Sequence, residues 1–172
     1  MNKQTFDKAE DKCFQKFKDF NQFLNLKDIK RTAKYSPTDV EGYTNFNQLV
    51  KVELKDRNLK LSPNLKIIMD ETKGTYTATT IFIEAHKYLD LLLARDYDNA
   101  IPLYINFLKD DYVLVYNLSS KLRRKPLETR ERKVHSMGYE GFELTKRKLL
   151  QLEDAYIYQK QGNTYTCLQK GN

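Results

Sequence analysis

The sequence predicts an α/β fold in which a mixed central sheet is flanked by helices. Three observations lead to this class. An amphipathic helix is expected near the start, a group of alternating strands follows it, and an apolar helix separates these strands from a later hairpin. The order helix, strands, helix, strands is typical of a sheet with mixed strand directions. The second helix fits a crossover between parallel strands.

The first element is expected to be a helix over residues 5–24. Its apolar residues recur at helical spacing, and these are Phe6, Cys13, Phe17, Phe20 and Leu24. A weak strand over 29–35, a short strand over 39–43 and a strand over 48–57 follow, so we expect an antiparallel meander of three strands.

The strand over 48–57 has the clearest pattern in the chain, because its residues alternate in character. Val50, Val52 and Leu54 point to one side, and a crowded charged face points to the other, formed by Lys51, Glu53, Lys55 and Arg57. Since side chains of a strand repeat with period two, this predicts one buried face and one charged face.

The middle of the chain carries weaker signals before a helix and a hairpin. Within residues 58–78 the run 65–69 fits either a strand or a short helix. A helix is expected from Thr79 or Thr80 to about Arg95, apolar over most of its circumference and therefore buried between layers. Two β-rich runs, 102–108 and 112–118, predict a hairpin.

The C-terminal part is expected to be a small extension of the same domain. Residues 142–152 fit a helix, and residues 154–158 fit a short closing strand. We expect residues 1–172 to form a single domain, because this length allows one core of ordinary size.

The composition argues against a membrane protein and against a zinc or disulfide framework. No apolar run approaches the roughly 20 residues that a membrane span needs, and the first residues lack the apolar core of a signal peptide. Two cysteines and two histidines lie at scattered positions without zinc-site spacing. We therefore expect a cytoplasmic protein. The small size and the Lys-, Asn- and Tyr-rich composition suit a phage or mobile-element protein, so the expected location is a bacterial or phage-infected host cell.

The charge suggests a polyanionic partner. The net charge is +7, and the segment 121–133 alone holds seven basic and two acidic residues. This segment is either a surface that grips nucleic-acid phosphates or a solvated, mobile loop.

A candidate site lies on the charged face of the strand over 48–57. Glu53 and Lys55 stand side by side there, and Asp39 on the neighbouring strand supplies a second carboxylate. Mg²⁺ takes oxygen ligands and usually only one or two protein carboxylates, so Asp39 and Glu53 could hold one ion. Lys55 could orient a water molecule or neutralise charge on a phosphate. The plainer interpretation is a half-exposed strand with its charges directed outward.

This arrangement resembles the PD-(D/E)XK nuclease superfamily, which has the restriction-endonuclease-like fold. The residues that carry the resemblance are Pro37-Thr38-Asp39 and Glu53-Leu54-Lys55, within a stretch of roughly residues 5 to 118. The resemblance implies that Asp39 and Glu53 are metal ligands for Mg²⁺ or Mn²⁺ and that Lys55 is catalytic. An extra residue separates Pro37 from Asp39, which leaves Glu41 as a rival for the first acid.

Other residues could belong to the same site or bind the substrate. Families with this fold place further polar residues on the helices, and the matching positions are Glu10, Glu84 and Lys87. Glu10 also fits a surface position, and Glu84 and Lys87 also fit an ordinary ion pair within a helix. The residues expected to contact nucleic acid are Lys51, Arg57, Arg123, Arg124, Lys125, Arg130, Arg132 and Lys133.

The sequence therefore predicts a Mg²⁺-dependent nuclease that cuts phosphodiester bonds, with DNA as the expected partner. Endonuclease and exonuclease action, and a monomer or a homodimer, all remain open. The alternative is a non-catalytic nucleic-acid-binding or structural protein that retains the nuclease fold.

Overall fold

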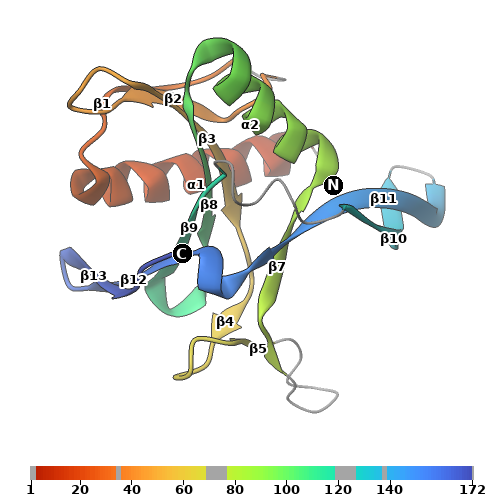
Figure 1. Cartoon of the computed structure of the whole chain (residues 1–172). Coiled ribbons are helices and arrows are strands. Elements are labelled where there is room, and N and C mark those ends of the chain that lie inside the picture. Colours follow the sequence, from red (N-terminus) through yellow and green to blue (C-terminus); the bar gives the residue numbers. More distant parts are fainter. Residues whose placement is uncertain (1–2, 34–35, 69–76, 119–126, 137–138, 172) are drawn as a thin grey trace.

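A seven-stranded mixed sheet runs through the centre of the molecule, with a helix on each face (Figure 1). The computed structural model describes residues 3–33, 36–68, 77–118, 127–136 and 139–171, with the backbone alone at 3–7 and 127–145. The strands follow the order β1 (Lys27–Arg31), β2 (Val40–Tyr43), β3 (Leu49–Asp56), β8 (Ile101–Phe107), β9 (Tyr112–Asn117), β12 (Tyr156–Gln161) and β13 (Thr164–Gln169).

The pairing of β3 with β8 is parallel, and the other pairs of this sheet are antiparallel. Parallel neighbours need a long connection that crosses over the sheet. Here the connection includes β7 (Thr80–Glu84) and α2 (Ala85–Asp98), and α2 ends at Asn99, whose backbone adopts the left-handed conformation with φ 52°.

The helix α1 (Lys3–Leu24) covers one face of the central sheet. Its residues Cys13, Phe17 and Phe20 are buried against a layer of sheet residues. That layer is formed by Val40, Val50, Val52, Leu54, Ile105, Phe107, Val113 and Val115. Phe20 is fully buried and contacts the rings of Phe107, Tyr158 and Tyr165.

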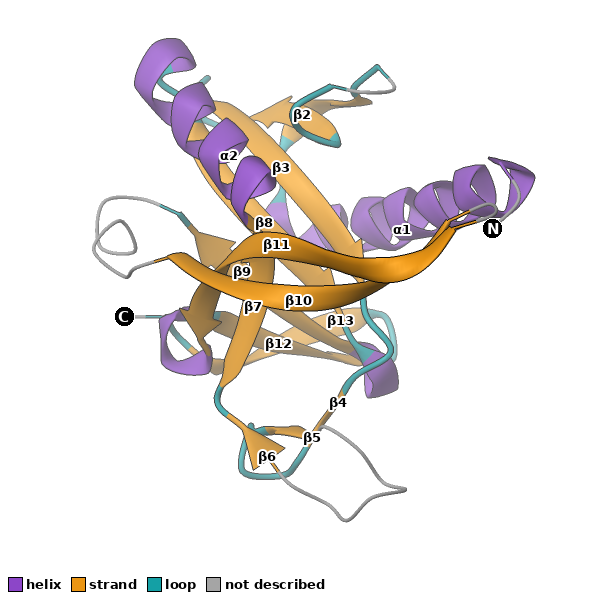
Figure 2. Cartoon of the chain, turned by 90° about the vertical axis from the view of Figure 1, so that its right-hand side faces the viewer, coloured by secondary structure: helices purple, strands orange, loops and turns teal. Residues whose placement is uncertain are grey.

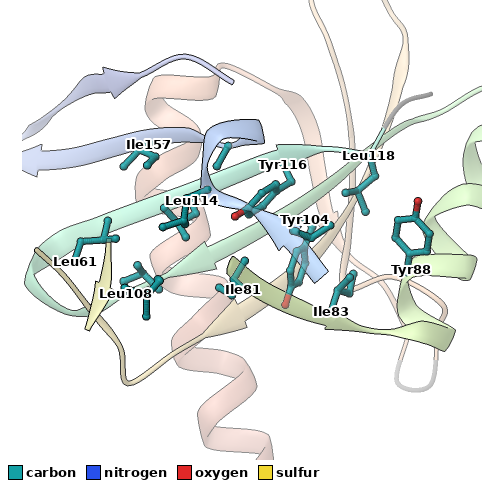
Figure 3. Close-up of a cluster of buried hydrophobic side chains, with 14 of the residues drawn as sticks. Leu61, Ile81, Ile83, Tyr88, Tyr104, Leu108, Leu114, Tyr116, Leu118 and Ile157 are labelled. Atoms are coloured by element: carbon teal, nitrogen blue, oxygen red, sulfur yellow. The ribbon is translucent and has the colours of Figure 1, made fainter. Parts of the chain in front are cut away.

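The opposite face is covered by α2, β7 and part of β11 (Tyr139–Gln151), which enclose a second core (Figure 3). Ile81 and Ile83 of β7 and Leu91 of α2 are buried in it. From the central sheet, Tyr104, Leu114 and Tyr116 contribute large buried side chains.

Two smaller sheets complete the fold. The first follows the order β10 (Leu127–Ser136), β11 and β7, and β10 and β11 form a twisted ribbon beyond the part that pairs with β7 (Figures 1 and 2). The second consists of β4 (Lys60–Leu61), β5 (Ile67–Ile68) and β6 (Thr77–Ala78). Two 3₁₀ turns lie at Lys109–Asp111 and Leu152–Asp154.

The structure confirms the predicted α/β class with a mixed sheet and two helices. The three-stranded meander, the crossover and the hairpin of β8 and β9 are all present. The ambiguous run 65–69 contains the short strand β5, and the weak strand expected over 29–35 is β1, which ends at Arg31.

Two helix predictions were wrong. Residues 80–84 form strand β7 and not the first turn of α2, because Ile81 and Ile83 bury alternate side chains while the backbone pairs with β11. Residues 142–152 belong largely to strand β11, which pairs with both β10 and β7. The C-terminal extension therefore consists of strands joined by a 3₁₀ turn and a tight turn, and the closing strand β12 starts at Tyr156 and pairs with β13.

We expect Phe20→Ala to lower the free energy of unfolding by about 3–5 kcal/mol, because it removes a fully buried ring from a close-packed aromatic cluster. Urea unfolding followed by circular dichroism measures this. Phe46, which is 95% exposed, provides the matched control, and Phe46→Ala should change stability by less than about 0.5 kcal/mol. Equal effects of the two variants would contradict the placement of α1 on the sheet.

Candidate active site

The odd-numbered side chains of β3 face β7 and α2, whereas Val50, Val52 and Leu54 are buried under α1, as the alternating pattern predicts. Residues later in this charged face pair with residues earlier in the crossover segment. Along β3, Lys51 pairs with Asp98, Glu53 with Lys87, and Lys55 with Glu84, while Arg57 donates to the carbonyl oxygen of Phe82. The charged residues therefore form an interface between the sheet and the crossover segment.

Asp39 lies at the bend that precedes β2, close enough to Glu53 for its charge to act on that carboxyl group. The backbone N–H of Asp39 donates to the carbonyl of Val52 at 2.9 Å, and its Oδ2 accepts a hydrogen bond from the N–H of Leu54 at 2.7 Å. These two bonds fix the Asp39 carboxylate beside β3.

Glu53 is a buried carboxylic acid, only 3% exposed. Burial, together with the negative charge of Asp39, raises its pKa to about 8, against the opposing effects of Lys87 and Lys55. A buried carboxylate that is costly to ionise is stabilised by any additional cation at the site. Perturbed acids of this kind are common at functional sites.

The lysine nearest to Glu53 comes from α2. Lys87 Nζ lies 3.1 Å from Glu53 Oε2, whereas Lys55 Nζ lies 3.5 Å from Glu84 Oε2. The alternative of an ion pair between Glu84 and Lys87 within the helix is thus wrong, because each residue pairs with a side chain of β3. Burial works against the charge of Lys87, but the charge and hydrogen bond of Glu53 raise its pKa overall.

Glu41 and Glu10 occupy other positions. Glu41 lies opposite Lys51 on β2, and its carboxylate contacts Lys30 at 3.1 Å and Lys51 at 3.4 Å. Glu10 pairs with Arg31 of β1 at 2.6 Å, which agrees with the surface position considered for it.

Arg57 is fixed by hydrogen bonds and a ring contact within the protein, which the sequence did not predict. Its Nε donates to Asn106 Oδ1 at 2.7 Å, its Nη2 donates to the Tyr104 hydroxyl at 2.6 Å, and its guanidinium lies 4.7 Å from the Phe82 ring centroid. Asn106 stands beside Lys55 in the parallel register and is fully buried. Asn106 could have been singled out from the sequence, because it is an amide side chain in an otherwise apolar and aromatic strand.

The donor set fits a hard divalent cation. Asp39 and Glu53 offer carboxylate oxygens, and Mg²⁺ needs only one or two of these when water and phosphate complete its coordination. Across the part of the chain that the structure describes, no group of three or more His, Cys, Asp or Glu residues is arranged to hold a metal. An ion here would therefore depend on water and on the substrate for its other ligands.

The residues expected to contact nucleic acid differ in their surroundings. Lys51 and Arg57 are engaged within the protein, as described above. Arg130, Arg132 and Lys133 lie on β10, so this part of the segment 121–133 has a strand backbone instead of forming a loop. The remaining three, Arg123, Arg124 and Lys125, fall outside the described residues.

Comparisons of the chain with protein-family models, with curated proteins and with solved structures found no match. Among the described helices, none has the length and apolar character that crossing a membrane requires.

Glu53 should make the stability of the protein depend on pH. Its pKa is about 8 in the folded state against 4.5 for an ordinary glutamate, so folding favours the protonated form. The resulting stabilisation is present below the lower value and is lost as the pH rises through 8. Between about pH 5 and pH 9, the wild type should lose roughly 2–5 kcal/mol of stability relative to Glu53→Gln.

Urea unfolding in metal-free buffer measures this difference. The matched control is Glu41→Gln. Burial opposes ionisation of Glu41, but hydrogen bonds from Lys30 and Lys51 lower its pKa below 4.5. The difference in unfolding free energy between Glu41→Gln and the wild type should therefore stay constant from about pH 5 to about pH 9. A pH-independent difference for Glu53→Gln would contradict the buried position of this acid.

Proposed function

We propose that this chain is a metal-dependent nuclease that hydrolyses phosphodiester bonds, with DNA as its substrate. The observation that carries the proposal is the proximity of the Asp39 carboxylate, held beside β3, to the buried Glu53, with Lys87 on Glu53 and Lys55 two residues along the strand. Two carboxylates that could share a cation, next to ammonium groups that could contact a phosphate, are the functional groups that metal-assisted phosphodiester hydrolysis requires.

The arrangement of the elements supports the same proposal. A helix, a meander that carries the Asp and the Glu-x-Lys residues, a crossover that contains a helix, and a hairpin follow one another along the chain. This order is the one on which the resemblance to the PD-(D/E)XK nuclease superfamily rests, and a restriction-endonuclease-like fold is part of the proposal.

In this proposal Asp39 and Glu53 hold Mg²⁺ or Mn²⁺. When bound, the ion would polarise the phosphate and lower the pKa of a bound water molecule. Asp39 is already oriented by the N–H of Leu54, and Glu53 is oriented by Lys87.

Lys55 contacts the phosphate in this proposal. Glu84 holds its ammonium on the same face as Glu53, and its side chain is 38% exposed, so it can reach a substrate at the surface. There it donates hydrogen bonds to phosphate oxygens as negative charge develops on them. Lys87 is a positioning residue, because it acts through the carboxylate of Glu53.

A second candidate function is a non-catalytic nucleic-acid-binding or structural protein that has kept this fold. One observation favours it, because each charged side chain of β3 from Lys51 to Arg57 has a partner within the protein. An interface whose only role is to attach α2 to the sheet would have the same pairs.

Cleavage of labelled DNA in the presence of Mg²⁺ or Mn²⁺ distinguishes the two functions. We expect the wild type to cut DNA, and we expect Glu53→Gln and Lys55→Ala to reduce the rate by roughly 10²-fold or more, because each removes a group that acts in the transition state. Retention of DNA in a gel-shift assay should change less than about threefold.

The matched control is Glu41→Gln, which removes a carboxylate from the same sheet face but away from Glu53, and its cleavage rate should equal that of the wild type. Unchanged cleavage by both Glu53→Gln and Lys55→Ala would contradict the site assignment. A wild type that binds DNA but cuts neither duplex, single-stranded nor branched DNA would favour the non-catalytic function.

A further inference from the structure

We propose that a groove beside this site accommodates one unpaired nucleobase of a single-stranded substrate. The groove has a volume of about 160 Å³ and lies between the turn that contains Pro37 and Thr38 and the second half of α2. The position of the base relative to the scissile phosphate rests on the proposed nuclease function. The groove itself does not depend on that function, because its lining side chains are all seen in the structure.

The groove is lined by sequence neighbours of the candidate-site residues on three elements. On the turn, Thr38 lines the groove and Asp39 is the next residue. On β3, Lys51 lines the groove two positions before Glu53, on the same strand face. On α2, Asp90 lines the groove one turn after Lys87, whose ammonium contacts Glu53. Tyr97 lies ten residues, roughly 15 Å, along α2 from Lys87, so a strand whose phosphate lies at Asp39 and Glu53 would place a base a few nucleotides farther along at this groove.

The lining suits the flat face of a base. Tyr97 is 84% exposed and Leu93 is 51% exposed, and both stand on the α2 side of the groove with Pro37 across from them. An aromatic ring with an open face stacks on any base, which makes such a contact tolerant of sequence. Large side chains this exposed at a groove gain buried area when a ligand covers them.

The charges in the groove suit a base better than a phosphate. Asp90 and Asp98 are hydrogen-bond acceptors, which can pair with the amino groups of a base but repel a phosphate. The cation in the groove, Lys51, is already held by Asp98 at 2.8 Å and Glu41 at 3.4 Å. The phosphate is therefore expected at Lys55 and the base at Tyr97.

A base within a duplex is stacked on both faces and paired at its edge, so it cannot lie against Tyr97 without leaving the helix. The substrate class that fits the groove is a single strand, which includes the unpaired part of a flap or a frayed end.

Binding of a short fluorescein-labelled single-stranded oligonucleotide in the presence of EDTA tests this proposal without any cleavage. We expect Tyr97→Ala to weaken binding about tenfold or more, because one base–aromatic stack is lost. Tyr97→Phe keeps the ring and should bind as the wild type does. Phe46→Ala is the matched control, since Phe46 is as exposed as Tyr97 but lies on the turn between β2 and β3. Binding to a blunt duplex should not change in any of these variants.

Three results would overturn the proposal. These are unchanged single-strand binding by Tyr97→Ala, an equal loss of single-strand and duplex binding, and a wild-type dimer that Tyr97→Ala converts to a monomer in sedimentation, which would assign the groove to a second copy of the chain. Cleavage by the wild type together with any of these results would leave the nuclease proposal standing. Tyr97-dependent binding without cleavage would support the groove and contradict the nuclease.

Discussion

The buried carboxylate of Glu53 is the constraint on which the arrangement of this molecule depends. A buried polar group left without a hydrogen-bond partner costs about 1–3 kcal/mol, so α2 must stay where Lys87 can reach Glu53 on β3. Two further pairs, Lys51 with Asp98 and Lys55 with Glu84, fix the same register between the strand and the crossover segment. The parallel pairing of β3 and β8 makes that crossover necessary, and the charged face of β3 determines how it lies.

This interface also gathers the groups that the proposed chemistry needs. Asp39 is held close to Glu53 because its backbone and side chain both hydrogen-bond to β3, and Lys55 remains partly exposed while it pairs with Glu84. The groove with Tyr97 follows the same boundary between β3 and α2 toward the end of the helix. The proposed metal ligands and the proposed base-binding groove thus both lie along the packing boundary between β3 and α2.

The sequence predicted the elements whose formation depends on nearby residues. Strand β3 was evident because one face is apolar and the other charged, and β8 with β9 because two β-rich runs flank a short turn. Elements set by distant contacts were missed. The run Thr80–Glu84 became strand β7 through pairing with β11, and the helix expected over 142–152 was replaced by a strand that pairs with β10 and β7. Glu84 and Lys87 pair with Lys55 and Glu53 of β3 and not with each other. This depends on how α2 lies over β3, and the spacing of residues within a helix does not predict it.

The central claim is that Asp39 and Glu53 hold one divalent cation, and anomalous diffraction from crystals soaked in MnCl₂ tests it most directly. The account predicts a single strong peak between the two carboxylates, with the Lys87 ammonium displaced from Glu53 or retained on its second oxygen. It also predicts that the peak disappears in crystals of Asp39→Asn and persists in Glu41→Gln. The absence of a peak at saturating Mn²⁺, or a peak at Glu41 and Asp98 in its place, would contradict the account.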